Sequence, residues 1–115
     1  TGGRIEGEIF RNQARAEEAL SLYKNTALNA FREVEQALAA EEWLREQEIS
    51  LRKAVEQTEA SQKLAVYSYR NGLIQILTLL DSYRSTFDAQ SAHLSVTRQL
   101  LSNRINLYLA LGGDV

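Results

Sequence analysis

Residues that break helices are almost absent from the interior of this 115-residue sequence. It has no proline, and Gly72 is its one glycine away from the chain ends. In helix interiors, proline and glycine are disfavoured relative to alanine by about 3 and 1 kcal/mol. The stretches 8–71 and 73–111 contain neither, and the first is rich in Ala, Glu, Leu, Gln and Arg. We therefore predict an all-α fold built from two long helices.

The reversal between the two helices is expected at Arg70-Asn71-Gly72. Asparagine and glycine tolerate the left-handed backbone angles that a tight turn needs. The sequence thus predicts a helix over about 5–70, a turn at 70–73 and a second helix over about 74–111. At about 1.5 Å per residue the helices are roughly 95 and 58 Å long, whereas a compact globule of this size is about 25–30 Å across. A rod-shaped, antiparallel two-helix hairpin follows.

Apolar residues recur every seven positions in both segments, which is typical of coiled-coil packing. A surface helix of a globular protein is the alternative, but helices this long are rare there. The series in the first segment includes Ala37, Leu44, Leu51, Thr58 and Ala65, and that in the second is Leu73, Leu80, Phe87, Leu94, Leu101 and Tyr108.

If the chain folds back at Asn71–Leu73, residues that face each other have numbers that sum to about 145. Leu51 then faces Leu94, and Glu41 faces Arg104, a pair that tolerates partial burial better than either charge alone. The same rule pairs Ala65 with Leu80, Thr58 with Phe87, Leu44 with Leu101 and Ala37 with Tyr108.

This pairing leaves about thirty residues at the start of the first helix without a partner. They carry an apolar stripe from Ile9 to Phe31, and a stripe of that length needs something to pack on. The partner is a third helix, another chain or sequence outside this segment. Since no helix breaker supports a third helix, we expect a fragment of a longer chain in a larger assembly.

The composition contains few residues that could form a catalytic or metal site. The sequence has no cysteine and one histidine, His93, which we interpret as a surface or rim residue. Thiolate and multi-histidine metal sites are therefore not expected, and no Glu-x-x-His spacing is present. We interpret the acidic residues of the first helix as parts of solvated faces or of ion pairs between helices. We predict no enzyme, cofactor or metal, and with a net charge of −2 no nucleic-acid partner. No apolar run approaches the roughly 20 residues of a transmembrane helix.

Several segments, in this order, resemble the C-terminal half of TolC-type outer-membrane factors that serve resistance-nodulation-division efflux pumps. They are distributed along nearly the whole chain and are Thr1–Arg4, Leu28–Leu38, Tyr69–Leu73, Leu77–Asp81 and Leu107–Asp114.

The resemblance implies a homotrimer in which an outer-membrane β-barrel continues into an α-barrel crossing the periplasm. This chain would be the second helical hairpin of that barrel, in the periplasm of a Gram-negative cell. Its function would be passive exit of drugs or other small compounds, with an adaptor protein docked at the tip and energy supplied by an inner-membrane pump. The alternative is a coiled-coil interaction module without a pore.

The resemblance also assigns roles near the turn. Leu77 and Asp81 match the family's constriction positions, and Arg84 matches a basic residue one turn on. Residues four apart share a helix face, so three copies would form an apolar ring and a carboxylate ring. The alternative for Asp81 is a pair with Arg84 in its own helix. The adaptor-docking tip would consist of Tyr69, Arg70, Asn71, Gly72 and Leu73.

One departure from the family pattern lies beside the constriction. Family members often have Asp-Ala-Gln where this chain has Asp81-Ser82-Tyr83. Because tyrosine is bulkier than glutamine, side-chain packing near the tip is expected to differ.

Overall fold

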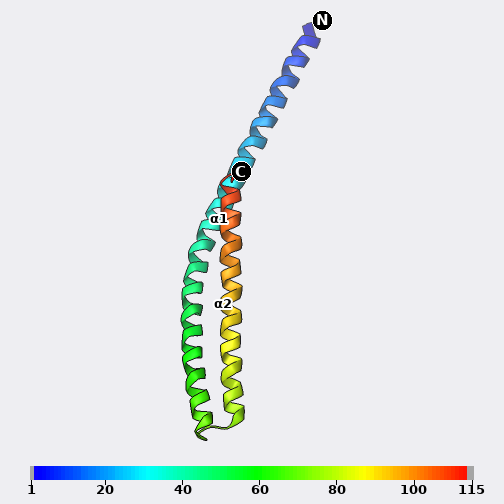
Figure 1. The fold of residues 1–115 in the computed structure, drawn as a ribbon. Coiled ribbons are helices and arrows are strands. Elements are labelled where there is room, and N and C mark those ends of the chain that lie inside the picture. Colours follow the sequence, from blue (N-terminus) through cyan, green and yellow to red (C-terminus); the bar gives the residue numbers. More distant parts are fainter. Residues whose placement is uncertain (1, 114–115) are drawn as a thin grey trace.

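The computed structural model describes residues 2–113 and consists of two antiparallel helices (Figure 1). Helix α1 spans Gly2–Arg70 and helix α2 spans Ile76–Ala110. The molecule measures 103 × 22 × 21 Å, and a straight helix of 69 residues is about 104 Å long. Helix α1 alone therefore sets the length of the rod. The predicted all-α hairpin is confirmed.

Helix α1 ends at the Asn-Gly pair because Gly72 adopts a left-handed backbone with φ of 70°. The N–H of Leu73 donates to the carbonyl of Ser68 at 2.8 Å, and the N–H of Gly72 donates to that of Tyr69 at 3.0 Å. These two bonds form a Schellman motif, which satisfies carbonyls left free at a helix end. The side chain of Asn71 adds a bond to a further carbonyl of the last turn.

Helix α2 begins at Ile76, two residues later than expected, because Gln75 has an extended backbone with φ −83° and ψ 158°. The C-terminal end of α2 has the same glycine-containing backbone motif as the end of α1. Gly112 has φ of 80°, and the N–H of Gly113 donates to the carbonyl of Tyr108 at 2.8 Å. Glycine thus terminates both helices by the same backbone geometry.

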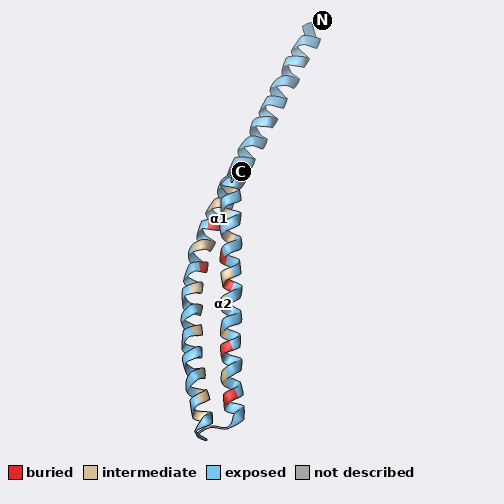
Figure 2. Ribbon diagram, viewed as in Figure 1, coloured by how far each residue is buried: buried red, intermediate tan, exposed pale blue. Residues whose placement is uncertain are grey.

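The two helices meet along one narrow stripe, which we call the seam (Figure 2). A cluster of Leu44, Val96 and Leu100 forms its centre, with Ala40 and Leu51 packed against it. No described side chain is more than 98% buried. The core is thin because each helix touches only one neighbour. The seam residues classed as buried are Ala37, Leu44, Leu79, Thr86, Val96 and Leu100.

The heptad series predicted for α1 lies in the seam, but the series predicted for α2 does not. Leu94 and Leu101 are 53% and 54% exposed, whereas Leu100 is 7% exposed. The positions in the seam are each one residue earlier, which rotates α2 by about 100°. All five predicted hydrophobic pairs are therefore wrong in their α2 member. The α2 residues that lie outside the seam are Leu80, Phe87, Leu94, Leu101 and Tyr108.

The predicted alignment along the axis is nevertheless confirmed. The Nε of Arg104 donates to Oε1 of Glu41 at 3.0 Å, as the sum of 145 requires. A second contact agrees to within one residue, since the hydroxyl of Thr86 donates to the carbonyl of Thr58 at 3.2 Å. The error in the hydrophobic pairs is thus one of rotation about the axis of α2, not of sliding along it.

The first third of α1 extends past the end of α2 (Figure 1). Every residue from 8 to 33 is exposed, so within residues 2–113 the predicted apolar stripe has no partner. In the same range, neither helix is long and apolar enough to cross a membrane. The large apolar side chains exposed along this part of α1 are Ile5, Ile9, Phe10, Leu20, Leu22, Tyr23, Leu28 and Phe31.

The rotation of α2 can be tested by crosslinking in the full-length protein. Cysteines replacing Leu44 and Leu100 should react rapidly with a short bifunctional reagent, because both side chains lie in the buried cluster. The matched pair at Leu44 and Leu101 should react at least several-fold more slowly, since Leu101 points away from the seam. Equal or reversed rates would contradict the observed rotation.

Candidate functional site

The tip of the rod is formed by the last turn of α1, the loop 71–75 and the first turn of α2 (Figure 1). All five residues expected at a docking tip, 69–73, lie together here and are exposed. Tyr69 is 42% exposed and Leu73 is 70% exposed. An aromatic ring and a branched apolar side chain are thus accessible on a backbone fixed by the Schellman motif.

The three expected constriction residues lie on the first turns of α2, beside the tip. Leu77 is 72% exposed. Nη2 of Arg84 lies 2.5 Å from Oδ1 of Asp81, with both side chains mostly exposed. The pair within one helix is therefore present, and ion pairs this exposed contribute little to stability. Together with Leu80, these side chains line a shallow surface hollow.

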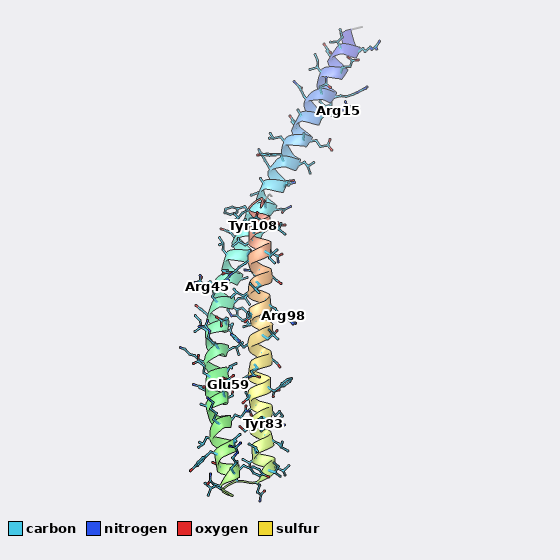
Figure 3. The ribbon with its side chains drawn as sticks, viewed as in Figure 1. Arg15, Arg45, Glu59, Tyr83, Arg98 and Tyr108 are labelled. Atoms are coloured by element: carbon cyan, nitrogen blue, oxygen red, sulfur yellow. The ribbon has the colours of Figure 1, made fainter. Side chains whose placement is uncertain are left out.

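Tyr83 is the residue at which the resemblance implied a departure from the family pattern. It lies on α2 close to the tip (Figure 3) and is 44% exposed. Its ring therefore adds partly exposed apolar surface near the tip.

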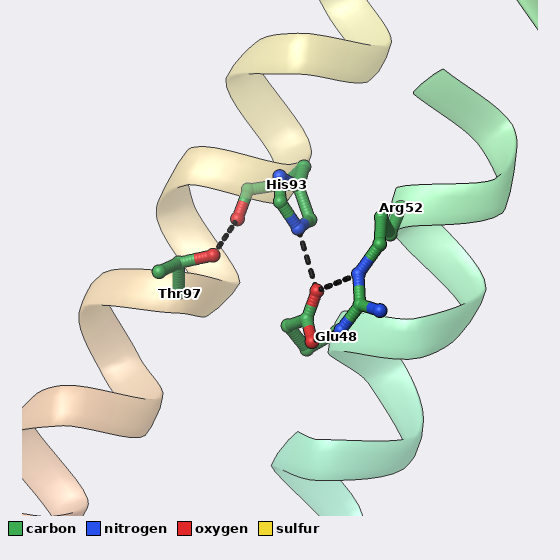
Figure 4. A network of polar contacts seen from close by, with 4 residues as sticks. All are labelled: Glu48, Arg52, His93 and Thr97. Carbon is green, nitrogen blue, oxygen red and sulfur yellow. Dashed lines mark hydrogen bonds and ion pairs between the residues drawn. The ribbon is translucent and has the colours of Figure 1, made fainter. Parts of the chain in front are cut away.

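A second polar cluster, which sequence reasoning missed, joins the helices near the middle of the hairpin (Figure 4). Nε2 of His93 lies 2.7 Å from Oε2 of Glu48. Nε of Arg52 donates to the same oxygen at 2.9 Å, and a second guanidinium nitrogen bonds to Oε1. The hydroxyl of Thr97 donates to the backbone carbonyl of His93 at 2.8 Å. We call Glu48, Arg52 and His93 the mid-hairpin cluster.

The cluster is partly shielded from water and strongly favours an ionised carboxylate. The side chains of Glu48 and His93 are 15% and 30% exposed. Hydrogen bonds from Arg52 and then from His93 lower the pKa of Glu48 to about 2. The position of His93 at the rim of the seam agrees with the prediction, whereas its contact with Glu48 on α1 was not predicted. The available signal was that 48 and 93 sum to 141, about one helical turn from the axial alignment.

Neither cluster has the composition of a catalytic or metal centre. Within residues 2–113, no group of three or more His, Cys, Asp or Glu side chains is placed to hold a metal ion. In the mid-hairpin cluster both carboxylate oxygens of Glu48 already accept bonds from cationic or imidazole nitrogens. The arrangement suits linking the helices, whereas the tip presents exposed groups for contact with other molecules.

Comparison with known proteins gives a consistent match along the whole chain. The family described as outer membrane efflux protein matches residues 1–113. The outer membrane protein OprJ of Pseudomonas aeruginosa is 36% identical over 112 residues, which is 97% of this chain and 23% of OprJ. The toluene efflux pump outer membrane protein TtgF of Pseudomonas putida is 34% identical, covering 98% of this chain and 24% of TtgF.

A third relative is named for the export of a different compound. The pyoverdine export outer membrane protein OpmQ of Pseudomonas putida is 35% identical over 111 residues, covering 96% of this chain and 24% of OpmQ. No solved structure gives a significant match. The chain spans about a quarter of the length of these relatives.

The family match covers both helices, the tip and the unpaired start of α1. The relatives extend over nearly the same residues. The chain belongs to the outer membrane efflux protein family.

Proposed function

We propose that this chain is the periplasmic helical hairpin of an outer-membrane channel through which drugs or other small compounds leave the cell. The observation that carries the proposal is a 103 Å helical rod, with most of its apolar side chains exposed, in a family of efflux proteins. Passage through it is passive, without a catalytic step or a cofactor. Because the relatives are named for toluene efflux and pyoverdine export, the family name does not fix the exported compound.

The exposed α2 series supports an assembly in which further helices flank the hairpin. Leu80, Phe87, Leu94, Leu101 and Tyr108 keep a spacing of seven outside the seam, each more than half exposed. Such a series is the signature of a second helix–helix contact. In our proposal these contacts are made with helices of the same protein and of its neighbours, in a homotrimeric α-barrel.

The position of the tip supports an entrance at this end of the barrel. Leu77 and Asp81 project from α2 within two turns of the loop, so three copies around an axis would form an apolar ring and a carboxylate ring. Arg84 holds each carboxylate in its own chain, which limits repulsion between the three charges. The entrance is closed by these residues and opens when the adaptor docks at 69–73.

The partners follow from this arrangement. A periplasmic adaptor protein contacts the tip, and an inner-membrane pump provides the energy indirectly. The protein resides in the outer membrane of a Gram-negative cell, with the hairpin in the periplasm. The comparisons favour this channel over a coiled-coil interaction module, since the relatives are named as outer membrane efflux or export proteins.

Replacing Asp81 with Ala in the full-length protein should raise single-channel conductance in a planar bilayer and weaken cation preference. The reason is that the substitution removes the carboxylate ring and its link to Arg84. Leu77→Ala should widen the opening without changing charge selectivity.

Asp88→Ala is the matched control, because Asp88 is exposed and lies on the same face of α2 about 10 Å further from the tip. It should leave conductance near the wild-type value. If Asp81→Ala behaved like this control while the trimer stayed intact, Asp81 would be an ordinary surface carboxylate and the constriction would lie elsewhere.

Docking at the tip should depend on Leu73. In the full-length protein, Leu73→Ala is expected to weaken binding of the purified adaptor by about tenfold, the size of effect seen when a central apolar contact is truncated. Leu64→Ala is the control, since Leu64 is similarly exposed but lies two turns before the loop. Equal affinities for the two variants, measured by surface plasmon resonance, would place the docking surface away from the tip.

A further inference from the structure

The two flanks of the hairpin, one on each side of the seam, differ in charge. On one flank, carboxylates of α1 accept hydrogen bonds from α2. Arg104 donates to Glu41, and the amide of Gln90 donates to Glu59. We propose that the opposite flank, which is uncharged, lines the duct, and that the charged flank of α1 faces away from it. This inference rests on the proposed function, because it requires a duct.

A surface hollow beside the seam shows which side chains of the two helices share the uncharged flank. Gln36 and Ala40 of α1 line this hollow together with Asn103 and Asn106 of α2. The one charged residue in its lining, Glu33, precedes the stretch of α1 that pairs with α2. Amide and methyl groups from both helices therefore lie side by side on this flank.

The uncharged flank continues from the hollow to the tip. The seam repeats every seven residues, so positions seven apart lie on the same side of it. Within 34–70, counting in sevens from Gln36 and from Ala40 meets no charged residue, and neither does counting back along α2 from Asn103 and Asn106. We call these positions the uncharged flank. Its exposed members include Trp43, Ser50, Gln57, Ser85, Ala92 and Gln99.

The difference between the flanks suits two different surroundings. In a duct, fixed charges of one sign attract ions of the opposite sign and repel those of the same sign. A lining of hydroxyl and amide groups is wetted by water without that selection. The other flank of α1 exposes charges of both signs, including Arg45, Glu56 and Lys63, as is usual for a surface in bulk water.

The position of Asp81 agrees with this orientation. Thr78 and Ser85 belong to the uncharged flank, and Asp81 lies three residues after the first and four before the second, so it shares their side of α2. The other acidic residue of α2, Asp88, follows Ser85 by three. Acidic groups thus border the flank near the tip. Selection by charge is therefore confined to the entrance, and compounds of either charge pass the rest of the hairpin equally well.

Thiol modification of the full-length protein in a planar bilayer tests the orientation. Gln57→Cys places a thiol on the uncharged flank. Glu59→Cys is the matched control, because position 59 is also exposed but lies about 200° around the helix. A methanethiosulfonate reagent that bears a sulfonate then adds a negative charge at each thiol.

Modification of Gln57→Cys should raise the ratio of cation to anion permeability by about twofold, since charges beside the ion path act over roughly one Debye length. The ratio in Glu59→Cys should not change. On α2, Ala92→Cys and its control Gln90→Cys form a second pair, again two residues apart and exposed. The same difference is expected there, and this pair decides the matter if a variant of the first fails to assemble.

Two results would overturn the inference while leaving the channel intact. One is a shift in the control variants without a shift in Gln57→Cys and Ala92→Cys. The other is a failure of the thiols at positions 57 and 92 to react in the assembled protein, judged by mass spectrometry, which would mean that this flank packs against further protein. A wild-type protein that forms no conducting pore would instead contradict the proposed function itself.

Discussion

Two helices that touch only each other can bury no more than one stripe of each, and this constraint governs the whole structure. Five apolar residues are buried in the described part of the hairpin. Three of them, Leu44, Val96 and Leu100, form the one cluster found there. Most other large apolar side chains remain exposed. An unusually thin core in a long rod is stable when further helices cover it, and the exposed heptad series offers a surface for such helices in the proposed assembly.

Polar contacts contribute something that the thin core cannot, namely a fixed alignment of the helices. Apolar contacts are non-directional, whereas the Glu41–Arg104 and Glu48–His93 pairs each require one axial position. The amide of Asn103, which donates to the carbonyl of Ala37 at 2.8 Å, adds a third constraint. Partial burial of charges has a desolvation cost. One sign of this cost is Oε2 of Glu41, which is buried and has no hydrogen-bond partner among the described residues.

Sequence reasoning predicted the helices and their axial alignment because each depends on residue types with strong local effects. Gly72 set the turn, and Glu41 with Arg104 set the alignment. The predicted rotation of α2 was wrong because leucines occupy neighbouring positions at 79–80 and 100–101. A seven-residue repeat can therefore be counted from either leucine of each pair. The Glu48–His93 contact needed the correct rotation before it could be seen. The gate and tip residues came from family resemblance, and a ring of three depends on chains outside this structure.

The central claim is that residues 34–70 find their partner in α2, whereas residues 2–33 depend on helices outside this chain. Hydrogen exchange of the isolated chain, compared with the full-length protein, tests it directly. In the isolated chain, amides of 34–70 should be protected while those of 2–33 exchange at nearly unprotected rates. Both regions should be protected in the full-length protein. Uniform protection along α1 in an isolated monomeric chain would contradict the account.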